Sequence, residues 1–241
     1  MKKVLLIIPA YNEEGSIEKT VAMIERHKSE TELPFTLDYV VINDGSTDET
    51  PHILDREHIH HIDLVQNLGI GGAVQTGYMY AYRNQYDIAV QFDGDGQHDI
   101  TSLVDVVQPI FRKEADFVIG SRFIDKSTEN FQSTKMRRVG INLISFAIKL
   151  VTGKRIYDTT SGYRAANKAV IQYFAHRYPV AYPEPESSVR LLKKGYHIQE
   201  VTANMFEREE GVSSIRALKS ITYMMDVLTS ILIAGFMKEK D

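Results

Sequence analysis

Short apolar runs rich in β-branched residues alternate with amphipathic stretches of helical period through the first half of the chain. The expected strands are 3–8, 38–43, 59–66, 88–93 and 117–120, and the expected helices are 16–28, 48–56, 71–83 and 100–112. Repeated strand, helix, strand order predicts an α/β fold with a mostly parallel sheet, and continuous apolar strands indicate that helices cover both of its faces. Ligands of such sheets bind outside the carboxyl ends of the strands.

Composition excludes several other classes of protein. The 241 residues include no cysteine, which rules out disulfides, cysteine metal sites and a cysteine nucleophile. The net charge is -4 without a long basic run, so no nucleic-acid partner is expected. The apolar start, 4–10, lacks a cleavage site and is expected to be a buried strand. Segment 227–237 is the longest uncharged run near the C-terminus, and it is shorter than the ~20 residues that span a bilayer.

Each of the first four expected strands is followed by a polar or glycine-rich loop. These loops are 9–14, 43–48, 67–72 and 93–99. Asn-Asp-Gly-Ser at 43–46 is also an ordinary turn and helix cap, and the glycines of 67–72 also suit a tight turn. The glycine loop fails the dinucleotide pattern because Val74 stands at its last glycine position, and the chain has no Walker lysine motif.

Two aspartates, Asp93 and Asp95, stand one residue apart after an apolar strand. Their charges repel unless a cation lies nearby, and Mg²⁺ or Mn²⁺ prefers such oxygen ligands together with substrate phosphates. Gly94 and Gly96 would let a phosphate approach the backbone closely. A solvated acidic turn is the alternative.

Six motifs in order and spacing connect this chain to a known family. They are IIPAYNEE, VINDGSTDET, NLGIGGA, QFDGDGQHD, GSR and DTTSGYRA. Over about residues 3–213 the chain resembles family 2 glycosyltransferases of GT-A fold, most closely the polyprenyl-phosphate sugar transferases of the dolichol-phosphate mannosyltransferase type. The resemblance implies a Rossmann-like GT-A catalytic domain over residues 1–212. Residues 213–241 are expected to form a C-terminal amphipathic helix.

The resemblance also implies a nucleotide-sugar site and a metal site. The residues expected to bind the nucleotide-sugar, UDP- or GDP-linked, are Pro9, Tyr11, Glu13, Asp44, Gly71 and Asp93. Mg²⁺ or Mn²⁺ would be held by Asp93, Asp95 and Gln97 against the donor diphosphate. A Lewis acid there stabilises the leaving group without proton transfer.

Four residues are expected to act in catalysis: Asp95, Arg122, Arg164 and Arg208. Arg208 matches the family's late arginine, which would add charge-assisted hydrogen bonds to the diphosphate. The family usually has a lysine directly after the serine that stands here at position 213, and this lysine would contact a phosphate. This chain has Ser214 at that position, so Arg216 or Lys219 are the candidates for the phosphate contact.

The acceptor class depends on whether the reaction needs a base. A sugar hydroxyl must lose a proton as it attacks, whereas a phosphomonoester with a second pKa of about 6 is already mostly a dianion at pH 7. Arg122, Arg137 and Arg138 are the cations expected to bind an acceptor phosphate, although the last two also suit a solvated helix start.

Three carboxylates are candidates for a base, if one is used. They are Asp158, Glu184 and Glu186. The two glutamates also suit the first turn of a helix with Pro185 at its first position, where the dipole favours acids. Among the eight histidines, His98 beside the acidic loop is the one singled out.

The C-terminal segment 214–237 carries an apolar stripe at helical spacing. The stripe consists of Ile215, Leu218, Ile221, Met225, Leu228, Leu232 and Phe236. We expect this helix to lie in the membrane interface or on a small membrane protein. The alternative is packing on the enzyme's own sheet or on a second subunit of a homo-oligomer.

These residues and the resemblance together predict a glycosyltransferase that moves a sugar from a nucleotide-sugar to a polyprenyl phosphate in cell-surface polysaccharide or glycoconjugate synthesis. The resemblance implies that the transfer is inverting. It is expected in the cytoplasm, peripheral on the cytoplasmic face of the membrane. The alternatives are a transferase acting on a glycan hydroxyl and a catalytically silent nucleotide-sugar binding protein.

Overall fold

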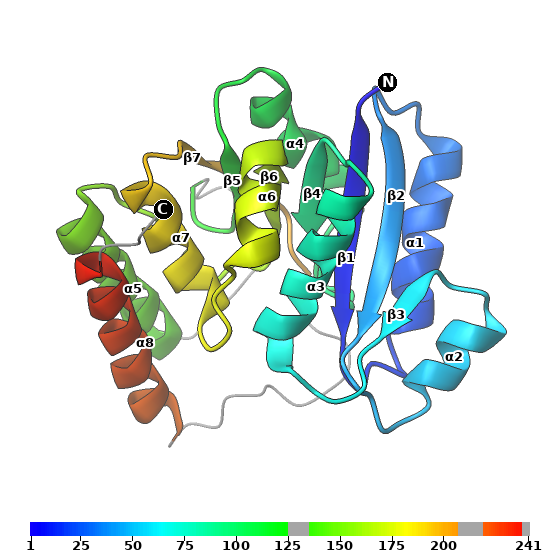
Figure 1. The fold of residues 1–241 in the computed structure, drawn as a ribbon, viewed down its shortest axis with the longest axis horizontal. Helices are drawn as coiled ribbons and strands as arrows, with labels where there is room; N and C mark the ends of the chain where they lie inside the picture. Colours follow the sequence, from blue (N-terminus) through cyan, green and yellow to red (C-terminus); the bar gives the residue numbers. More distant parts are fainter. Residues whose placement is uncertain (125–134, 207–218, 238–241) are drawn as a thin grey trace.

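The computed structural model describes residues 1–124, 135–206 and 219–237, which form a seven-stranded sheet with helices on both faces (Figure 1). The strands are β1 (Lys3–Ala10), β2 (Thr36–Asn43), β3 (His61–Asp63), β4 (Ile88–Gln91), β5 (Phe117–Ser121), β6 (Arg164–Asn167) and β7 (Ile198–Thr202). The helices are α1 (Ile17–Glu30), α2 (Thr50–Arg56), α3 (Gly69–Arg83), α4 (Leu103–Phe111), α5 (Lys135–Thr152), α6 (Lys168–His176), α7 (Pro183–Lys193) and α8 (Lys219–Phe236), with a 3-10 turn at Ile100–Ser102.

The order of strands across the sheet is β3-β2-β1-β4-β6-β5-β7. Every neighbouring pair is parallel except the two made by β6, which runs antiparallel to both β4 and β5. The expected α/β fold with a mostly parallel sheet is confirmed. The antiparallel β6 was not expected, because its short Arg-Ala-Ala-Asn sequence carries no clear strand pattern.

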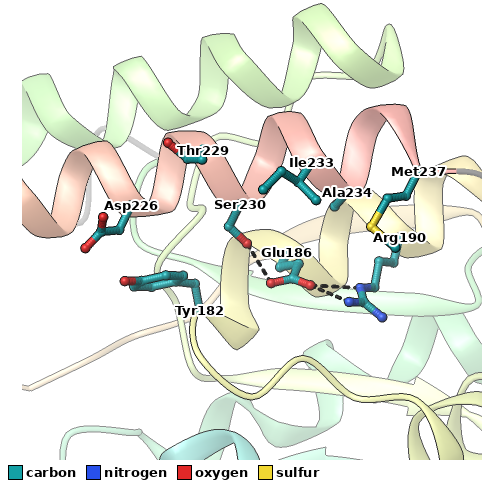
Figure 2. A pocket seen from close by; sticks show the side chains of 9 residues that line it. All are labelled: Tyr182, Glu186, Arg190, Asp226, Thr229, Ser230, Ile233, Ala234 and Met237. Atoms are coloured by element: carbon teal, nitrogen blue, oxygen red, sulfur yellow. Dashed lines mark hydrogen bonds and ion pairs between the residues drawn. The ribbon is translucent and has the colours of Figure 1, made fainter.

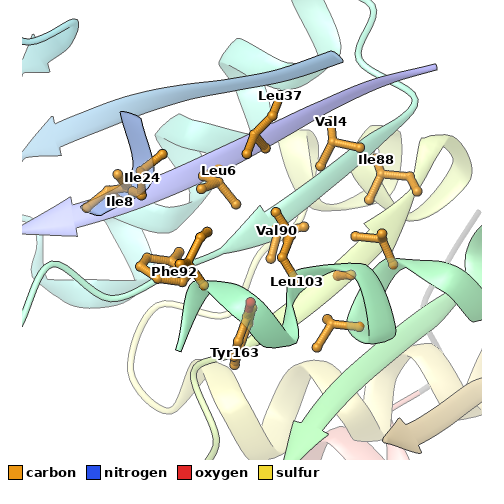
Figure 3. Close-up of a cluster of buried hydrophobic side chains, with 14 of the residues drawn as sticks. Val4, Leu6, Ile8, Ile24, Leu37, Ile88, Val90, Phe92, Leu103 and Tyr163 are labelled. Atoms are coloured by element: carbon orange, nitrogen blue, oxygen red, sulfur yellow. The ribbon is translucent and has the colours of Figure 1, made fainter. Parts of the chain in front are cut away.

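Strand β1 lies at the centre of the core. Val4, Leu6 and Ile8 face α1 and α4, where Phe92 and Tyr163 complete the cluster (Figure 3). The alternate residues, such as Ile7, face α3 and α6 on the other side. Full burial of each such side chain contributes about 1.5–3 kcal/mol, so this strand fixes the sheet and the direction of the loop that follows it.

Two expected elements differ most from the structure in extent. The strand expected over 59–66 is only His61–Asp63, because β3 is an edge strand and Val65 is fully exposed beyond it. The helix expected over 100–112 begins as a 3-10 turn, in which the Asp99 carboxylate accepts the Thr101 N–H.

Helices α5 and α8 lie side by side at one end of the molecule (Figure 1). A Cβ on Gly140 would approach Met224, and one on Gly235 would approach Val151, so the two helices run parallel and touch closely through glycines. Helix α8 also packs on α7.

Helix α8 does not present the expected stripe of the C-terminal segment as one buried or one exposed face. Val227 and Ile231 are buried against the domain, while Met225, Leu232 and Phe236 of the expected stripe are exposed. The helix thus packs on the neighbouring helices α5 and α7 and keeps apolar residues exposed on a second side. Within the described ranges, none of the helices has the length and apolar character needed to cross a bilayer.

Candidate active site at the carboxyl edge of the sheet

The loops after β1 and β2 are tied together by hydrogen bonds between side chains and backbone. Asn12 adopts a left-handed backbone with φ of 55°, its N–H donates to Ser46 Oγ at 3.0 Å, and its side-chain oxygen accepts the Thr47 N–H at 2.8 Å. Glu13 N–H donates to Thr50 Oγ1 at 2.9 Å. These contacts leave Tyr11 half-exposed at the rim.

The loop after β2 also reaches the glycine-rich loop after β3. Asp44 is buried, and its carboxylate accepts the Leu68 N–H at 2.7 Å. Burial raises the pKa of Asp44, and the backbone N–H groups of Leu68 and Gly69 oppose that rise. Gly45, at φ +67°, lies so close to this loop that a Cβ would stand 2.8 Å from Asn67 N.

Gly71 has a packing role that the sequence did not reveal. A Cβ there would stand 2.4 Å from the Val180 carbonyl oxygen and 2.6 Å from that of Pro179. The start of α3 therefore packs directly on the segment before α7. This contact explains the glycine without a ligand, and the predicted nucleotide-sugar contact of Gly71 stays a prediction.

The acidic loop after β4 meets the end of β1. Thr20 on α1 donates its hydroxyl to the Gly94 carbonyl at 3.1 Å, and a Cβ on Gly94 would stand 3.1 Å from the Pro9 carbonyl oxygen. Asp93 thus lies at the same edge as Pro9, as the sequence predicted. The four loops form one continuous surface outside the strand ends.

Asp93 is held by groups from three parts of the chain. Its Oδ1 accepts from Gln91 Nε2 at 3.2 Å, and its Oδ2 lies 3.5 Å from His98 Nε2. Gly162 lies against the same carboxylate, since a Cβ there would stand 2.5 Å from Oδ2. The side chain of Asp93 remains 30% exposed and so can still meet a ligand.

The remaining predicted metal ligands follow directly on this loop. Asp95 Oδ1 accepts the Gln97 N–H at 3.1 Å, and Gly96 turns the chain at φ +74°. Gln97 is joined to the segment after β7, because its carbonyl accepts the Phe206 N–H at 2.8 Å. Two partly exposed carboxylates and an amide fit a hard divalent cation that takes its other ligands from phosphates and water. In the described part of the chain, no three His, Cys, Asp or Glu side chains cluster as a self-sufficient metal cage.

Arg122, after β5, is fixed by a buried acid. Its Nε and one terminal nitrogen donate to Asp158 at 2.8 and 2.7 Å, and it also donates to Thr160 Oγ1 at 3.0 Å. Asp158 is fully buried, and its own N–H donates to Glu200 at 2.7 Å. Burial raises the pKa of Glu200. Asp158 is therefore a partner of Arg122 and does not face an acceptor as a base would.

Arg138 lies close to Arg122 in space. The guanidinium carbons of Arg122 and Arg138 stand 5.3 and 5.9 Å from the ring centroid of Phe123. The structure thus brings together two of the three cations that the sequence assigned to the acceptor phosphate. The side chain of Arg137 lies outside the described residues, as do Arg208, Ser214, Arg216 and the side chain of Lys219.

The surroundings of Arg164 do not suit the catalytic role that was expected from the sequence. The side chain is buried, and its guanidinium donates to the Ser161 carbonyl at 2.6 Å, the Glu184 carbonyl at 2.6 Å and Ser187 Oγ at 3.0 Å. A desolvated charge needs such partners, and here the protein itself supplies them. Arg164 holds the first turn of α7 against the strand end, and its geometry does not support a direct phosphate contact.

The two candidate glutamates have different surroundings. Helix α7 begins at Pro183, not at Pro185, so Glu184 and Glu186 are first-turn acids as the alternative interpretation held. Glu186 pairs with Arg190 and accepts from Ser230 Oγ at 2.7 Å, which joins α7 to α8 (Figure 2). Burial raises the pKa of Glu184, the positive charge of Arg164 lowers it, and the negative charge of Asp93 raises it. Of the two glutamates, Glu184 is thus the one whose pKa is affected by the charge of the acidic loop.

Comparison with known proteins decides the family. Residues 5–174 match the family described as Glycosyl transferase family 2. The chain belongs to this glycosyltransferase family. It is 32% identical over 194 residues to the UDP-N-acetylglucosamine--dolichyl-phosphate N-acetylglucosaminyltransferase of Methanococcus voltae, covering 73% of this chain and 74% of that one. It is 26% identical to the polyprenol monophosphomannose synthase of Mycolicibacterium smegmatis, covering 89% and 81%.

Solved structures show the same GT-A glycosyltransferase fold. Glucosyl-3-phosphoglycerate synthase from Mycobacterium tuberculosis, in complex with Mn²⁺ and UDP-glucose, superposes with a TM-score of 0.67 at 18% identity, covering 99% of this chain and 81% of that one. At this identity the likeness concerns the fold. That protein was crystallised with the type of metal and donor that the sequence predicted for this glycosyltransferase.

The site of this glycosyltransferase contains residues that sequence reasoning did not assign. Gly162 contacts Asp93, and Glu200 holds the segment that presents Asp158. Gly162 stood in a recognised motif, Thr-Ser-Gly-Tyr-Arg, but the motif does not show what the glycine touches. A pocket of about 330 Å³ lies elsewhere, between α7 and α8, and its polar lining includes the paired Glu186 and Arg190 (Figure 2).

Proposed function

We propose that this glycosyltransferase moves a sugar from a nucleoside-diphosphate sugar to a polyprenyl phosphate. The observation that carries the proposal is the joining of the acidic loop, Asp93 to Gln97, with the loops after β1 and β2 at one edge of the sheet. Family membership supports the transfer chemistry. The names of the Methanococcus voltae and Mycolicibacterium smegmatis relatives support a polyprenyl-type acceptor.

In the proposed reaction, an oxygen of the acceptor phosphate attacks the anomeric carbon while the bond from that carbon to the donor diphosphate breaks. Attack opposite the leaving group inverts the configuration. A divalent ion held by Asp93, Asp95 and Gln97 would neutralise charge on the departing diphosphate. Arg138, whose guanidinium carbon stands 5.9 Å from the Phe123 ring centroid, would attract and orient the acceptor phosphate. Arg122, which is paired with Asp158 and only 7% exposed, would hold the strand end behind it.

The pairing of carboxylates favours a phosphate acceptor. Asp158 is occupied by Arg122, and Glu186 is occupied by Arg190 and Ser230. A phosphate dianion needs no base, so transfer to a phosphate does not require any of these paired carboxylates to be free. Glu184 supports the second candidate, transfer to a glycan hydroxyl, because a carboxyl group with a raised pKa near the acidic loop is a candidate base.

A product screen tests the proposal. The purified protein is incubated with Mg²⁺ or Mn²⁺, a panel of UDP- and GDP-sugars, and either undecaprenyl phosphate or a soluble oligosaccharide, and products are identified by mass spectrometry. We expect a glycosyl phosphate lipid, its near-complete loss in Asp95→Ala, and normal yield in Asp105→Ala, an exposed acid on α4. A product on the oligosaccharide alone would support transfer to a glycan hydroxyl. Donor binding without turnover on either acceptor would support the silent binding protein.

The proposed function includes peripheral attachment to the membrane that holds the acceptor. Exposed apolar side chains line the α5–α8 seam, which we define as Val139, Leu143, Phe146, Leu150, Met225, Leu232 and Phe236. Phe146 is 63% exposed, Leu150 71% and Phe236 80%, and the exposed basic residues Arg138 and Lys149 lie on α5 beside them. Apolar side chains flanked by cations suit an interface with anionic lipid.

Sedimentation with anionic vesicles tests this attachment. The paired change of Phe146→Glu and Leu150→Glu is expected to release the protein from vesicles while soluble donor binding is kept. Val65→Glu, at an exposed apolar position outside the seam, is the control. Unchanged sedimentation of the paired variant would overturn the attachment, and a change in oligomeric state instead would identify the seam as a contact between copies.

A further inference from the structure

His98 is a buried histidine inside the acidic loop. The residue is 2% exposed. Its ring stacks on Tyr163 at 4.8 Å between centroids and 14° between planes, and it meets the Phe92 ring edge-on at 5.3 Å. Phe92 and Tyr163 belong to the core beneath β1 and β4 (Figure 3). The ring is therefore held in one orientation by rigid neighbours.

The backbone of His98 is fixed as well. It forms an isolated antiparallel bridge with Met205, and the neighbouring Asp99 N–H donates to the Asn204 carbonyl at 3.3 Å. The ring consequently has neither backbone nor rotamer freedom to drift from the carboxylate beside it.

One hydrogen bond determines which ring nitrogen carries the proton. The backbone N–H of Asp93 donates to His98 Nδ1 at 3.0 Å. A backbone N–H cannot accept, so Nδ1 must present a lone pair and the proton lies on Nε2. The Nε2 atom that carries this proton lies 3.5 Å from Asp93 Oδ2, so the N–H group makes an electrostatic contact with the carboxylate.

We propose that His98 is a positioning residue that holds both the backbone and the carboxylate of Asp93, and thereby orients this ligand toward the divalent ion. The inference rests on the proposed function, because it assumes that Asp93 binds the metal. Groups behind the ligands orient them and commonly alter metal affinity by about 10- to 100-fold. A purely structural histidine would use the stacking and the Nδ1 bond alone.

Two substitutions separate these roles. In His98→Asn, the amide oxygen can replace Nδ1 as the acceptor, but the side chain is too short to reach Asp93 Oδ2. In His98→Gln, the longer side chain can place an amide N–H near the position of Nε2. We measure Mn²⁺ affinity by electron paramagnetic resonance, with and without UDP and without turnover. His98→Asn is expected to weaken Mn²⁺ binding by about tenfold or more, and His98→Gln by clearly less. Tyr163→Phe keeps the stacked ring and is the control, with unchanged affinity.

Other outcomes are decisive. Equal Mn²⁺ affinity in wild type and His98→Asn would overturn the positioning role. So would weaker Mn²⁺ binding in His98→Gln than in His98→Asn. Wild-type protein without Mn²⁺ binding would overturn the proposed metal site as well. Binding that Asp95→Ala removes and His98→Asn spares would overturn only the role of His98.

A measurement on the unmodified chain does not depend on how the variants fold. Long-range ¹⁵N–¹H correlation spectra of the wild-type, metal-free protein report the tautomer of each histidine. The neutral ring of His98 protonated on Nε2 is expected. A ring protonated on Nδ1, or on both nitrogens, would contradict the geometry on which the inference stands.

Discussion

The carboxylate of Asp158 and the guanidinium of Arg122 meet at two points, with Nε 2.8 Å from Oδ2 and a terminal nitrogen 2.7 Å from Oδ1. Both side chains are almost wholly withdrawn from water, at 0% and 7% exposure. The two residues stand 36 positions apart in the chain, with the whole of α5 between them. This ion pair connects the end of β5 to the turn that precedes β6.

Asp158→Asn is expected to destabilise the protein strongly, because it leaves a buried guanidinium without its counter-charge. Loss of one partner of a buried pair costs about 3–5 kcal/mol in unfolding free energy. Urea denaturation followed by circular dichroism measures this. Asp55→Asn, at an exposed acid, is the control and should change stability by less than about 0.5 kcal/mol. A comparably small effect of Asp158→Asn would show that the pair does not stabilise the fold.

Gly162→Ala is expected to impair function without unfolding the protein. The new Cβ would stand 2.5 Å from Asp93 Oδ2, so the carboxylate must move from its present position. We expect Mn²⁺ affinity and kcat/KM to fall by about tenfold or more, with the melting temperature nearly unchanged. Adding Gly162→Ala to Asp93→Ala should cost nothing further, since the two changes act on one group. Additive losses would mean that Gly162 acts elsewhere.

Glu184→Gln distinguishes the two acceptor classes. A general base contributes about 10²–10⁴-fold to rate, and a phosphate acceptor does not use one. Transfer to a polyprenyl phosphate by Glu184→Gln should therefore stay within about tenfold of wild type. Glu186→Gln is the matched control, because Glu186 joins α7 to α8 and should affect stability more than rate. A drop of about 100-fold or more in Glu184→Gln alone would favour a hydroxyl acceptor.

Asp87 is expected to contribute stability that disappears in acid. Burial raises its pKa, but hydrogen bonds from the Lys3 N–H, Lys2 and Lys168 outweigh this and lower the pKa to about 2. A lowered pKa in the folded state means that the contribution is complete above the ordinary value near 4 and is lost as the pH falls toward 2.

The measurement is the stability of Asp87→Asn against wild type as a function of pH. Since both lysines are more than half exposed, screening limits the expected difference at pH 7 to about 1 kcal/mol. The two stability curves should converge between pH 4 and pH 2. Curves that stay parallel through this range would contradict the assigned cause.

The sequence by itself determined the elements of the first half and the edge at which the site lies. Apolar period and strand-end loops are local properties, and in a parallel sheet the strand ends must meet at one edge. This reasoning placed Pro9, Asp44 and Asp93 on one surface, and the hydrogen bonds between their loops confirm that arrangement. Their binding roles stay predictions.

Only the tertiary structure decided what the long charged side chains do. Arg164 is a catalytic candidate by sequence, yet it is buried against the first turn of α7, where Ser187 stands 23 residues further along the chain. Glu186 looked equivalent to Glu184, yet its carboxylate meets Ser230, 44 residues away. A carboxylate or guanidinium shows its charge in the sequence, but its partners come from packing between distant elements. The antiparallel pairing of β6 and the packing of α8 on α5 and α7 could not be predicted from the sequence for the same reason, because both depend on contacts between distant elements.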